Sequence, residues 1–287
     1  CHFNWHNFKY PVANLNRFLR QMEWRGIPVF GMELRLDRSQ PFATHDNPNW
    51  QRVDVGANNV LFQKEACVNK VVDSLPREFT NVAWVDADLE FSNQQAFAVA
   101  NSMLNSMKVV QMFSHAVWTN RAGDESNRRD SCIHTGMDNR WLGHSGFAWA
   151  ARREMFHDIG GLYSTTPVGH GDTVFALAVA NGQIRDPHGN KYGVGVNTAA
   201  HDQWADRIRG WVGSSAGVVD GECWHAWHGE MKNRQYVQRS EVLKNFDHEK
   251  HLMINHQGIL EWRPEAPQHM REHVVKYFEN RQEDTES

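Results

Sequence analysis

The sequence predicts an α/β fold in which a mostly parallel sheet is flanked by helices. Short apolar runs typical of buried strands, at residues 27–32, 82–85 and 109–113, alternate with segments of helical periodicity. In the first helix, apolar side chains recur at i, i+3, i+4 and i+7. They are Leu15, Phe18, Leu19 and Met22. Parallel strands joined by crossover helices produce this alternation, so we expect a doubly wound sheet.

The expected elements follow one another along the whole chain. The first half should contain strand, helix and strand over residues 1–36, a polar connection over 37–58, helices at about 60–74 and 94–106, and strands at 82–85 and 109–113. Residues 119–140 are charged and almost free of aliphatic side chains, which predicts a mobile surface loop or an inert insertion. Order should return at 146–150, with a helix from Asp172, a loop-rich stretch at 186–203, a polar helix at 232–245, and a C-terminal helix at 268–280 whose tail, 283–287, frays.

Composition narrows the class of protein. The chain has 287 residues, a net charge of −4 and four cysteines without C-x-x-C spacing, which fits a soluble, cytoplasmic protein and excludes a zinc ribbon or disulfide framework. No apolar run is long enough to span a membrane. Twelve Trp and 17 His exceed ordinary usage, and they suit sugar or base stacking and metal or acid–base chemistry, although core Trp and surface His are the simpler interpretation.

Two acids separated by one residue, Asp86 and Asp88, come directly after the apolar run at 82–85. Open α/β sheets bind ligands at the carboxyl edge, where this pair is expected to lie. Carboxylates are hard oxygen ligands, so the pair is suited to hold Mg²⁺ or Mn²⁺ together with a diphosphate. An acidic turn or helix cap is the alternative interpretation.

Later segments extend the pattern in a fixed order. They are residues 144–150 (HSGFAWA), 159–163 (IGGLY), 169–175 (GHGDTVF) and 227–236 (WHGEMKNRQY). Together with the acid pair, this series resembles the nucleotide-sugar-dependent glycosyltransferases of the GT-A fold, and its ending is similar to that of bacterial, phage and large-virus members. The resemblance implies one catalytic domain over residues 1–262, with a nucleotide-sugar-binding half (1–113) and an acceptor half (141–262), followed by a C-terminal helix and tail (263–287).

The resemblance also implies an activity. We expect metal-dependent transfer of a sugar, with Mn²⁺ or Mg²⁺, from a nucleotide-diphosphate sugar such as a UDP-sugar to a hydroxyl of a glycan, lipid, protein or modified DNA base. One alternative is a phage-type enzyme that acts on a hydroxymethylated DNA base in the host cytoplasm. The net negative charge of the chain disfavours DNA binding, whereas basic residues of the 119–140 loop favour it. Those residues are Arg121, Arg128, Arg129 and Arg140. A non-catalytic nucleotide-sugar-binding protein and a metal-dependent phosphohydrolase are the others.

Metal and base residues follow from the same resemblance. Asp88 is expected to bind the metal directly, and Asp86 to bind it through water or to hold the ribose. His228 is the expected third ligand, with His225 as its rival and packing beside Trp227 as the alternative. Asp172 is expected to take the proton of the acceptor hydroxyl in an inverting displacement. Capping of the helix that starts there is the competing role.

Donor and substrate residues complete the set of predictions. For the donor we expect contributions from Glu33 at the end of the second strand, Lys64, Arg234 and Tyr236. A surface salt bridge to Glu65 or Asp73 is the alternative for Lys64. For the substrate we expect Gly146, His170 and Trp149. Core packing is the alternative for Trp149, and His170 departs from the commoner Gly-Glu-Asp pattern.

Overall fold

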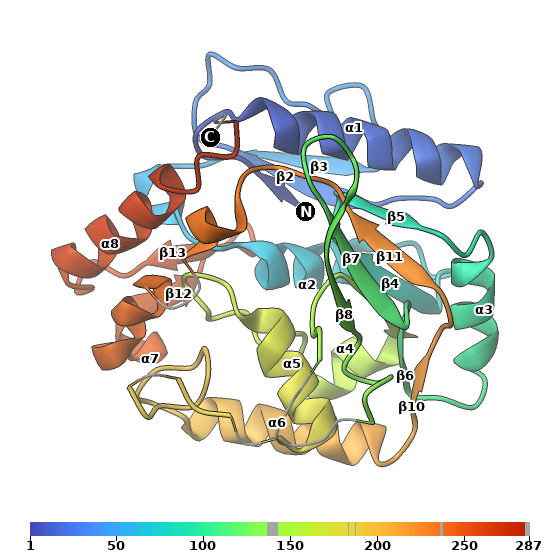
Figure 1. Cartoon of the computed structure of the whole chain (residues 1–287). Helices are drawn as coiled ribbons and strands as arrows, with labels where there is room; N and C mark the ends of the chain where they lie inside the picture. Colours follow the sequence, from blue (N-terminus) through green and yellow to red (C-terminus); the bar gives the residue numbers. More distant parts are fainter. Residues whose placement is uncertain (137–142, 183, 187, 236–237, 285–287) are drawn as a thin grey trace.

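The computed structural model describes residues 1–136, 143–182, 184–186, 188–235 and 238–284 (Figure 1). The described chain is a mixed α/β structure, which confirms the predicted class in its broad sense. Its helices are α1 (Lys9–Trp24), α2 (Lys64–Ser74), α3 (Ala96–Met103), α4 (Glu154–Ile159), α5 (Gly171–Ala180), α6 (Ala199–Val212), α7 (His248–His251) and α8 (Gln268–Glu279). None of these helices is both long and apolar enough to cross a membrane.

The strands of the described residues form four sheets rather than one. In spatial order, the first sheet contains β1 (His2–Phe3), β2 (Gly31–Arg35) and β3 (Trp50–Asp54), and the second contains β10 (Ala216–Val218), β6 (Val109–Gln111), β9 (Ala148–Arg152) and β4 (Asn81–Val85). The third contains β5 (Leu89–Phe91), β11 (Glu222–His225), β7 (His115–Thr119) and β8 (Glu125–Asp130). The fourth pairs β12 (Leu252–Ile254) with β13 (Leu260–Trp262). Only the first sheet is wholly parallel. In the second, β9 runs antiparallel to both β6 and β4. The expectation of one mostly parallel sheet was therefore wrong, because β9 runs antiparallel between β6 and β4. The acid pair follows β4, which is an edge strand of this sheet within the described residues, and not a central strand.

Helices α4, α5 and α6 lie together against the β4–β9 face (Figure 1). Trp84 of β4 packs edge-to-face against Phe156 and Phe175, at centroid separations of 5.4 and 5.3 Å. Trp149 of β9 packs on Phe175 from the neighbouring position and is 1% exposed. Aromatic pairs in this geometry add stability beyond the area they bury, so this cluster anchors the helices to the strand that precedes Asp86.

Several local predictions need correction. The polar connection over 37–58 contains β3, which pairs in parallel with β2. The expected loop at 119–140 contains the second strand of a hairpin, because β8 pairs antiparallel with β7 and carries charged side chains at most of its exposed positions. The second strand begins at Gly31 rather than at residue 27. The described residues of 232–245 form no α-helix and instead belong to 3₁₀ helices at Met231–Arg234 and Gln238–Asn245.

Of the tail that we expected to fray, 283–287, the described residues Glu283 and Asp284 are held by contacts, and 285–287 lie outside the described residues. Asp284 accepts hydrogen bonds from the backbone N–H groups of Lys9 and Tyr10 at the start of α1, at 2.6–3.0 Å, and so caps that helix. Glu283 is 6% exposed. Helix α8 shares a core with Trp5 and other residues of the N-terminal elements, so the end of the chain packs against its beginning.

Candidate metal and anion site

Strand pairing brings the second acid of the pair beside two histidines. Asp88 directly precedes β5, which runs antiparallel to β11 with Leu89 opposite His225. The next rung of the ladder is made by Ala226, whose N–H donates to the Asp88 carbonyl at 2.9 Å. Chain segments more than 130 positions apart are thus aligned, and the Asp88 side chain meets the imidazoles of His225 and His228.

The three side chains converge on one point. Oδ2 of Asp88 lies 3.0 Å from Nε2 of His228 and 3.4 Å from Nε2 of His225, and the two nitrogens are 3.3 Å apart. Ligand atoms about 2.1 Å from one ion and at right angles to each other lie about 3 Å apart. The other oxygen of Asp88, Oδ1, is buried without a hydrogen-bond partner in the described structure. The donor set and the unpartnered oxygen therefore fit a divalent cation.

The protonation states also suit metal binding. Although burial alone raises it, the pKa of Asp88 is held well below its ordinary value by His225, His228 and Arg234. Burial, with a smaller contribution from the Arg234 charge, lowers the pKa of His225 to about 3, although Asp88 opposes this. At neutral pH, Asp88 is therefore ionised and His225 is neutral, which are the forms that ligate metals.

Surrounding groups hold the two imidazoles in place. The His225 ring stacks between Phe147 and His228, at centroid distances of 5.3 and 5.0 Å. Nδ1 of His228 lies 3.0 Å from the Glu283 carboxylate, which also pairs with Arg281. A carboxylate on the outer nitrogen of a metal-binding histidine fixes its ring orientation and raises its basicity. The tail thus supports the site directly.

Asp86 does not join this cluster. Its Oδ1 lies 2.5 Å from Nζ of Lys64, which also pairs with both oxygens of Asp172 at 2.9 and 3.0 Å. Lys64 is the first residue of α2 and is 8% exposed, so the surface salt bridge considered for it is wrong. Burial and the nearby Asp172 and Asp88 raise the pKa of Asp86 to about 6, against the opposing effect of Lys64. One buried ammonium therefore holds two carboxylates from different segments.

Asp172 is not a capping residue. The cap of α5 is His170, whose φ of 81° is left-handed, and no side chain caps the helix. Asp172 instead lies in the first turn of α5, and its carboxylate accepts a hydrogen bond from the ammonium group of Lys64. Gly171, between His170 and Asp172, is required by packing, because a Cβ there would fall 2.1 Å from the carboxylate of Glu65. A Cβ at Gly146 would lie 3.1 Å from Oδ2 of Asp172, so Gly146 keeps the space beside that oxygen open.

These groups line one cavity of about 870 Å³. Its walls carry the acids Asp86, Asp88, Asp172 and Glu283, the bases Lys64, Arg129, Lys232, Arg234, Arg239 and Arg281, and the rings of Trp118, Phe147, His144 and Tyr192. A volume of this size accommodates a ligand as large as a nucleotide. The combination of cations, a metal-ligand cluster and aromatic surfaces is suited to a polyphosphate that carries flat or ring-shaped groups.

Other predicted site residues have different surroundings. Glu33 lies within β2 and accepts hydrogen bonds from the backbone of Ala43 and from Thr44 at 2.7–2.9 Å, away from the cavity lining. Trp149 is wholly buried in the core, so it offers no surface to a sugar and the prediction of a sugar platform was wrong. Tyr236 and Arg140 lie outside the described residues.

His170 lines the cavity, yet its ring nitrogens are engaged by protein groups. They lie 3.2 Å from Nη2 of Arg239 and 3.2 Å from Oγ of Ser240. Burial and the Arg239 charge lower the pKa of His170 well below its ordinary value. His170 therefore ties the 3₁₀ segment that contains Arg239 to the start of α5.

Sequence patterns did not identify three contributors, Glu283, Arg239 and Arg281. The tail acid stands in a polar run that reads as a frayed end, and the two arginines lie in segments without a motif. These residues are far from the motifs in the sequence and reach the site only because α8 and the 3₁₀ segment fold back onto it. Comparison with protein-family models, with curated proteins and with solved structures found no match.

Proposed function

We propose that this protein is a metal-dependent glycosyltransferase that moves a sugar from a nucleotide-diphosphate sugar to an acceptor hydroxyl. The observation that carries the proposal is one cavity in which the Asp88–His225–His228 cluster adjoins the Lys64–Asp172 pair. Such a cavity offers a metal site for the phosphates and a carboxylate for the acceptor. The order of sequence motifs supports the same class.

The donor set favours Mn²⁺ over Mg²⁺. Two imidazole nitrogens and one carboxylate oxygen suit a transition metal, whereas Mg²⁺ prefers oxygen ligands and retains its waters. A metal bound by Asp88, His225 and His228 supplies Lewis-acid stabilisation of the diphosphate leaving group.

Arginines of the cavity neutralise the remaining phosphate charge. Arg234 donates from Nη2 to Nε2 of His228 at 2.6 Å in the free protein, so it must leave that nitrogen when the metal binds, and its guanidinium is then beside the cation and its phosphates. Arg239 is 8% exposed and is oriented by the hydroxyl of Tyr277 at 3.1 Å. Planar guanidinium groups bind phosphate oxygens in pairs and stay charged in buried sites, which suits them to hold a nucleoside diphosphate.

Asp172 is the proposed base. It accepts the proton of the acceptor hydroxyl while that oxygen attacks the anomeric carbon and the sugar–phosphate bond breaks, so the configuration of that carbon inverts. In the free protein Lys64 restrains the carboxylate. An anionic donor competes for the same ammonium, and its binding would release Asp172 for proton transfer.

The class of acceptor is narrowed by the hairpin. Of the basic residues that favoured DNA, Arg128 is paired with both Glu125 and Glu222 at 2.6–2.9 Å. Arg121 lies over the ring of Trp227 at 5.9 Å. A phosphate backbone would have to compete with these partners, and we therefore propose a glycan, lipid or protein hydroxyl rather than a DNA base.

Donor hydrolysis tests the proposal. Many glycosyltransferases slowly cleave their donor in water, so the protein is incubated with Mn²⁺ and a panel of UDP-, GDP- and CDP-sugars, and free nucleoside diphosphate is measured. The proposal is supported if one donor is hydrolysed, if this hydrolysis requires Mn²⁺, and if Asp88→Asn abolishes it. Release of inorganic phosphate from simple phosphomonoesters, with every nucleotide sugar intact, would indicate a phosphohydrolase instead. Tight binding of a nucleotide sugar without turnover, even with added acceptors, would indicate a binding protein.

A further inference from the structure

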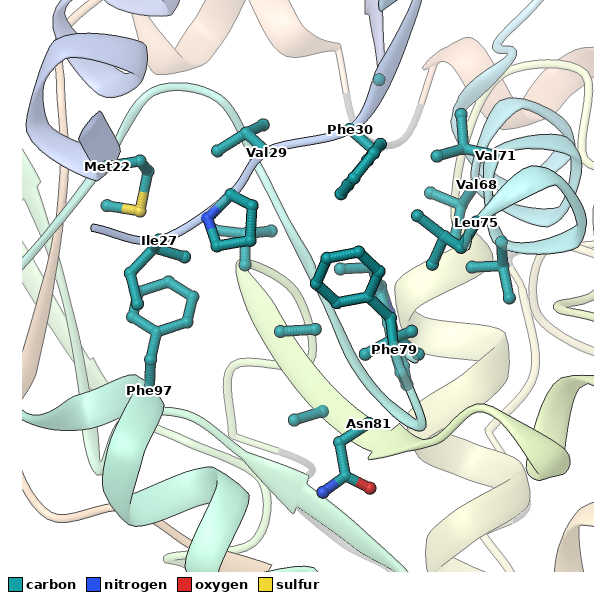
Figure 2. Close-up of a pocket in the computed structure, with 18 of the residues that line it drawn as sticks. Met22, Ile27, Val29, Phe30, Val68, Val71, Leu75, Phe79, Asn81 and Phe97 are labelled. Atoms are coloured by element: carbon teal, nitrogen blue, oxygen red, sulfur yellow. The ribbon is translucent and has the colours of Figure 1, made fainter. Parts of the chain in front are cut away.

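A second cavity, of about 470 Å³, lies along β4 next to the candidate site and is lined mainly by apolar side chains. Figure 2 shows Ile27, Val29 and Phe30 on one wall and Val68 and Phe79 facing them, with the side chains pointing into the space between. We call this cavity the slot. It separates the segment that leads into β2 from strand β4 and from helix α2.

The slot lies between two strand edges that lack a partner. Within the described residues, β4 is bonded only to β9, and its outer edge faces the slot. On the other side, β1 pairs with β2 at only two positions, Glu33 and Leu34. Residues 28–30, which precede β2 and line the slot, make no backbone hydrogen bond that joins them to β4. Ala83, in the middle of β4, is exposed in a part of the molecule that is otherwise core.

The register of β1 shows what fits between these edges. His2 lies opposite Glu33 and Phe3 opposite Leu34 in a parallel ladder. A strand that continues β1 in the N-terminal direction would pass Met32 and Gly31 and then enter the slot along residues 27–30. At about 3.3 Å per residue, five residues extend about 17 Å, a common strand length.

We infer that the slot binds an extended apolar strand that continues β1 in the N-terminal direction and joins the first two sheets into one. Both faces of such a strand are covered, by α2 on one side and by α3 and α1 residues on the other, so it should be a continuous run of Val and Ile rather than an alternating one. An aliphatic lipid chain would fill the volume but leave the N–H and C=O groups of both edges unpaired, which is costly in an apolar cavity.

The strand would also act on the candidate site. Val85 and Ala87, which flank Asp86, line both the slot and the larger cavity. Pairing along β4 would fix the backbone from which Asp86 and Asp88 project. This consequence does not depend on the chemistry proposed for the site, because it concerns only the backbone.

Fusion of a short strand tests the inference. A five-residue segment of Val and Ile is placed directly before Cys1 in the full chain, and a Gly/Ser segment of equal length is the matched control. The apolar fusion should raise Tm by about 5 °C or more and slow amide exchange at residues 28–31 and 82–85 at least ~10-fold. The Gly/Ser fusion should change neither. Equal Tm and equal exchange in the two fusions would overturn the inference.

Two further measurements keep the test decisive if the fusion aggregates. The same five residues, carried on a peptide with a Lys tail and added to the unfused chain, should protect residues 82–85 from exchange, and Ala83→Arg, which puts a charge into the slot, should abolish that protection. Dodecanoate is the lipid comparison. If dodecanoate raises Tm more than the peptide does and the peptide protects nothing, the slot binds a lipid chain and the inference is wrong.

Discussion

The carboxylate of Glu283, four residues beyond the end of α8, lies 3.0 Å from Nδ1 of His228. Both side chains are buried, at 6% exposure each. The contact aligns Nε2 of His228 with the carboxylate of Asp88, 3.0 Å away. Asp284, the next residue, caps α1, so the described part of the tail is bound at two adjacent residues. The order of the tail and the geometry of the metal ligands are therefore coupled.

Glu283→Gln should weaken Mn²⁺ binding about 10–100-fold, the usual effect of removing the outer partner of a metal-binding histidine. The amide keeps the size of the side chain but loses the charge that stabilises the imidazole. Affinity is measured by titrating Mn²⁺ and recording its paramagnetic resonance signal. Glu279→Gln, at the exposed last position of α8, is the control and should bind as the wild type. Equal affinities in all three proteins would leave Glu283 as a packing residue only.

Asp86 and Asp88 should differ in their effect on metal binding. Asp88→Asn and His225→Ala should each lower Mn²⁺ affinity by at least ~10-fold, since a cation held by few ligands loses much of its affinity when one is removed. Asp86→Asn should stay within about 3-fold of the wild type in the same assay, because Asp86 pairs with Lys64. Asp130→Asn in the exposed His115–Asp130–His134 group is the control for non-specific surface binding. An Asp86 variant as weak as Asp88→Asn would place both acids on the metal.

The family resemblance already made Asp88 the expected direct ligand and gave Asp86 a different role, but no local pattern of the sequence explains that difference. The apolar run and its terminal acids predicted the place of Asp86 after a strand correctly, since strand signals are local. Which acid meets the histidines depends on the antiparallel pairing of β5 with β11. That register is set by contacts between distant segments, and no short motif encodes it. The tail shows the same limit, because Glu283 is buried only by the return of α8 to the site.

Local composition also led to wrong predictions for the β7–β8 hairpin and for Trp149. The charged run at 119–140 lacks aliphatic residues because β8 pairs only with β7 and exposes its other edge and most of its side chains. Strand alternation is invisible when both faces are polar. Trp149 lies in a strand buried on both faces, so its sequence offered no alternation to show which way the ring points. Helix boundaries were predicted best at the start of α5, expected at Asp172 and found at Gly171, and at α8, expected over 268–280 and found at Gln268–Glu279.

Asp172→Asn should retain donor and Mn²⁺ binding but lower the rate of sugar transfer by roughly 10²–10⁴-fold, the usual contribution of a positioned base. The helix itself should not be affected, because His170 is the cap. Single-turnover transfer with a saturating donor measures the chemical step, and Asp73→Asn at an exposed site is the control. The product should have an inverted anomeric centre by NMR. Wild-type rates in the variant, or retention of configuration, would exclude Asp172 as a base in direct displacement.

Glu65 should make the fold less stable as pH rises. Burial, then the nearby Asp172, raises the pKa of Glu65 to about 8, although Lys64 opposes this, and one of its oxygens has no hydrogen-bond partner in the described structure. The folded state therefore keeps a proton that the unfolded chain, with a pKa near 4.5, releases. Where the folded state binds more protons, the free energy of unfolding falls with rising pH. For Glu65 the loss should begin near pH 4.5 and be complete above pH 8.

Glu65→Gln should remove this loss, because the amide is neutral at every pH and nearly the same size. Tm of the variant should match that of the wild type at pH 4.5 and exceed it by several degrees at pH 8.5, since about 1.4 kcal/mol accompanies each pKa unit. Asp86 contributes a loss of the same sign, but it is present in both proteins and cancels in the difference. Glu78→Gln, exposed a few residues beyond α2, is the matched control. A Tm difference that stays constant from pH 4.5 to 8.5 would mean that Glu65 is ionised in the folded protein and that Lys64 outweighs its burial.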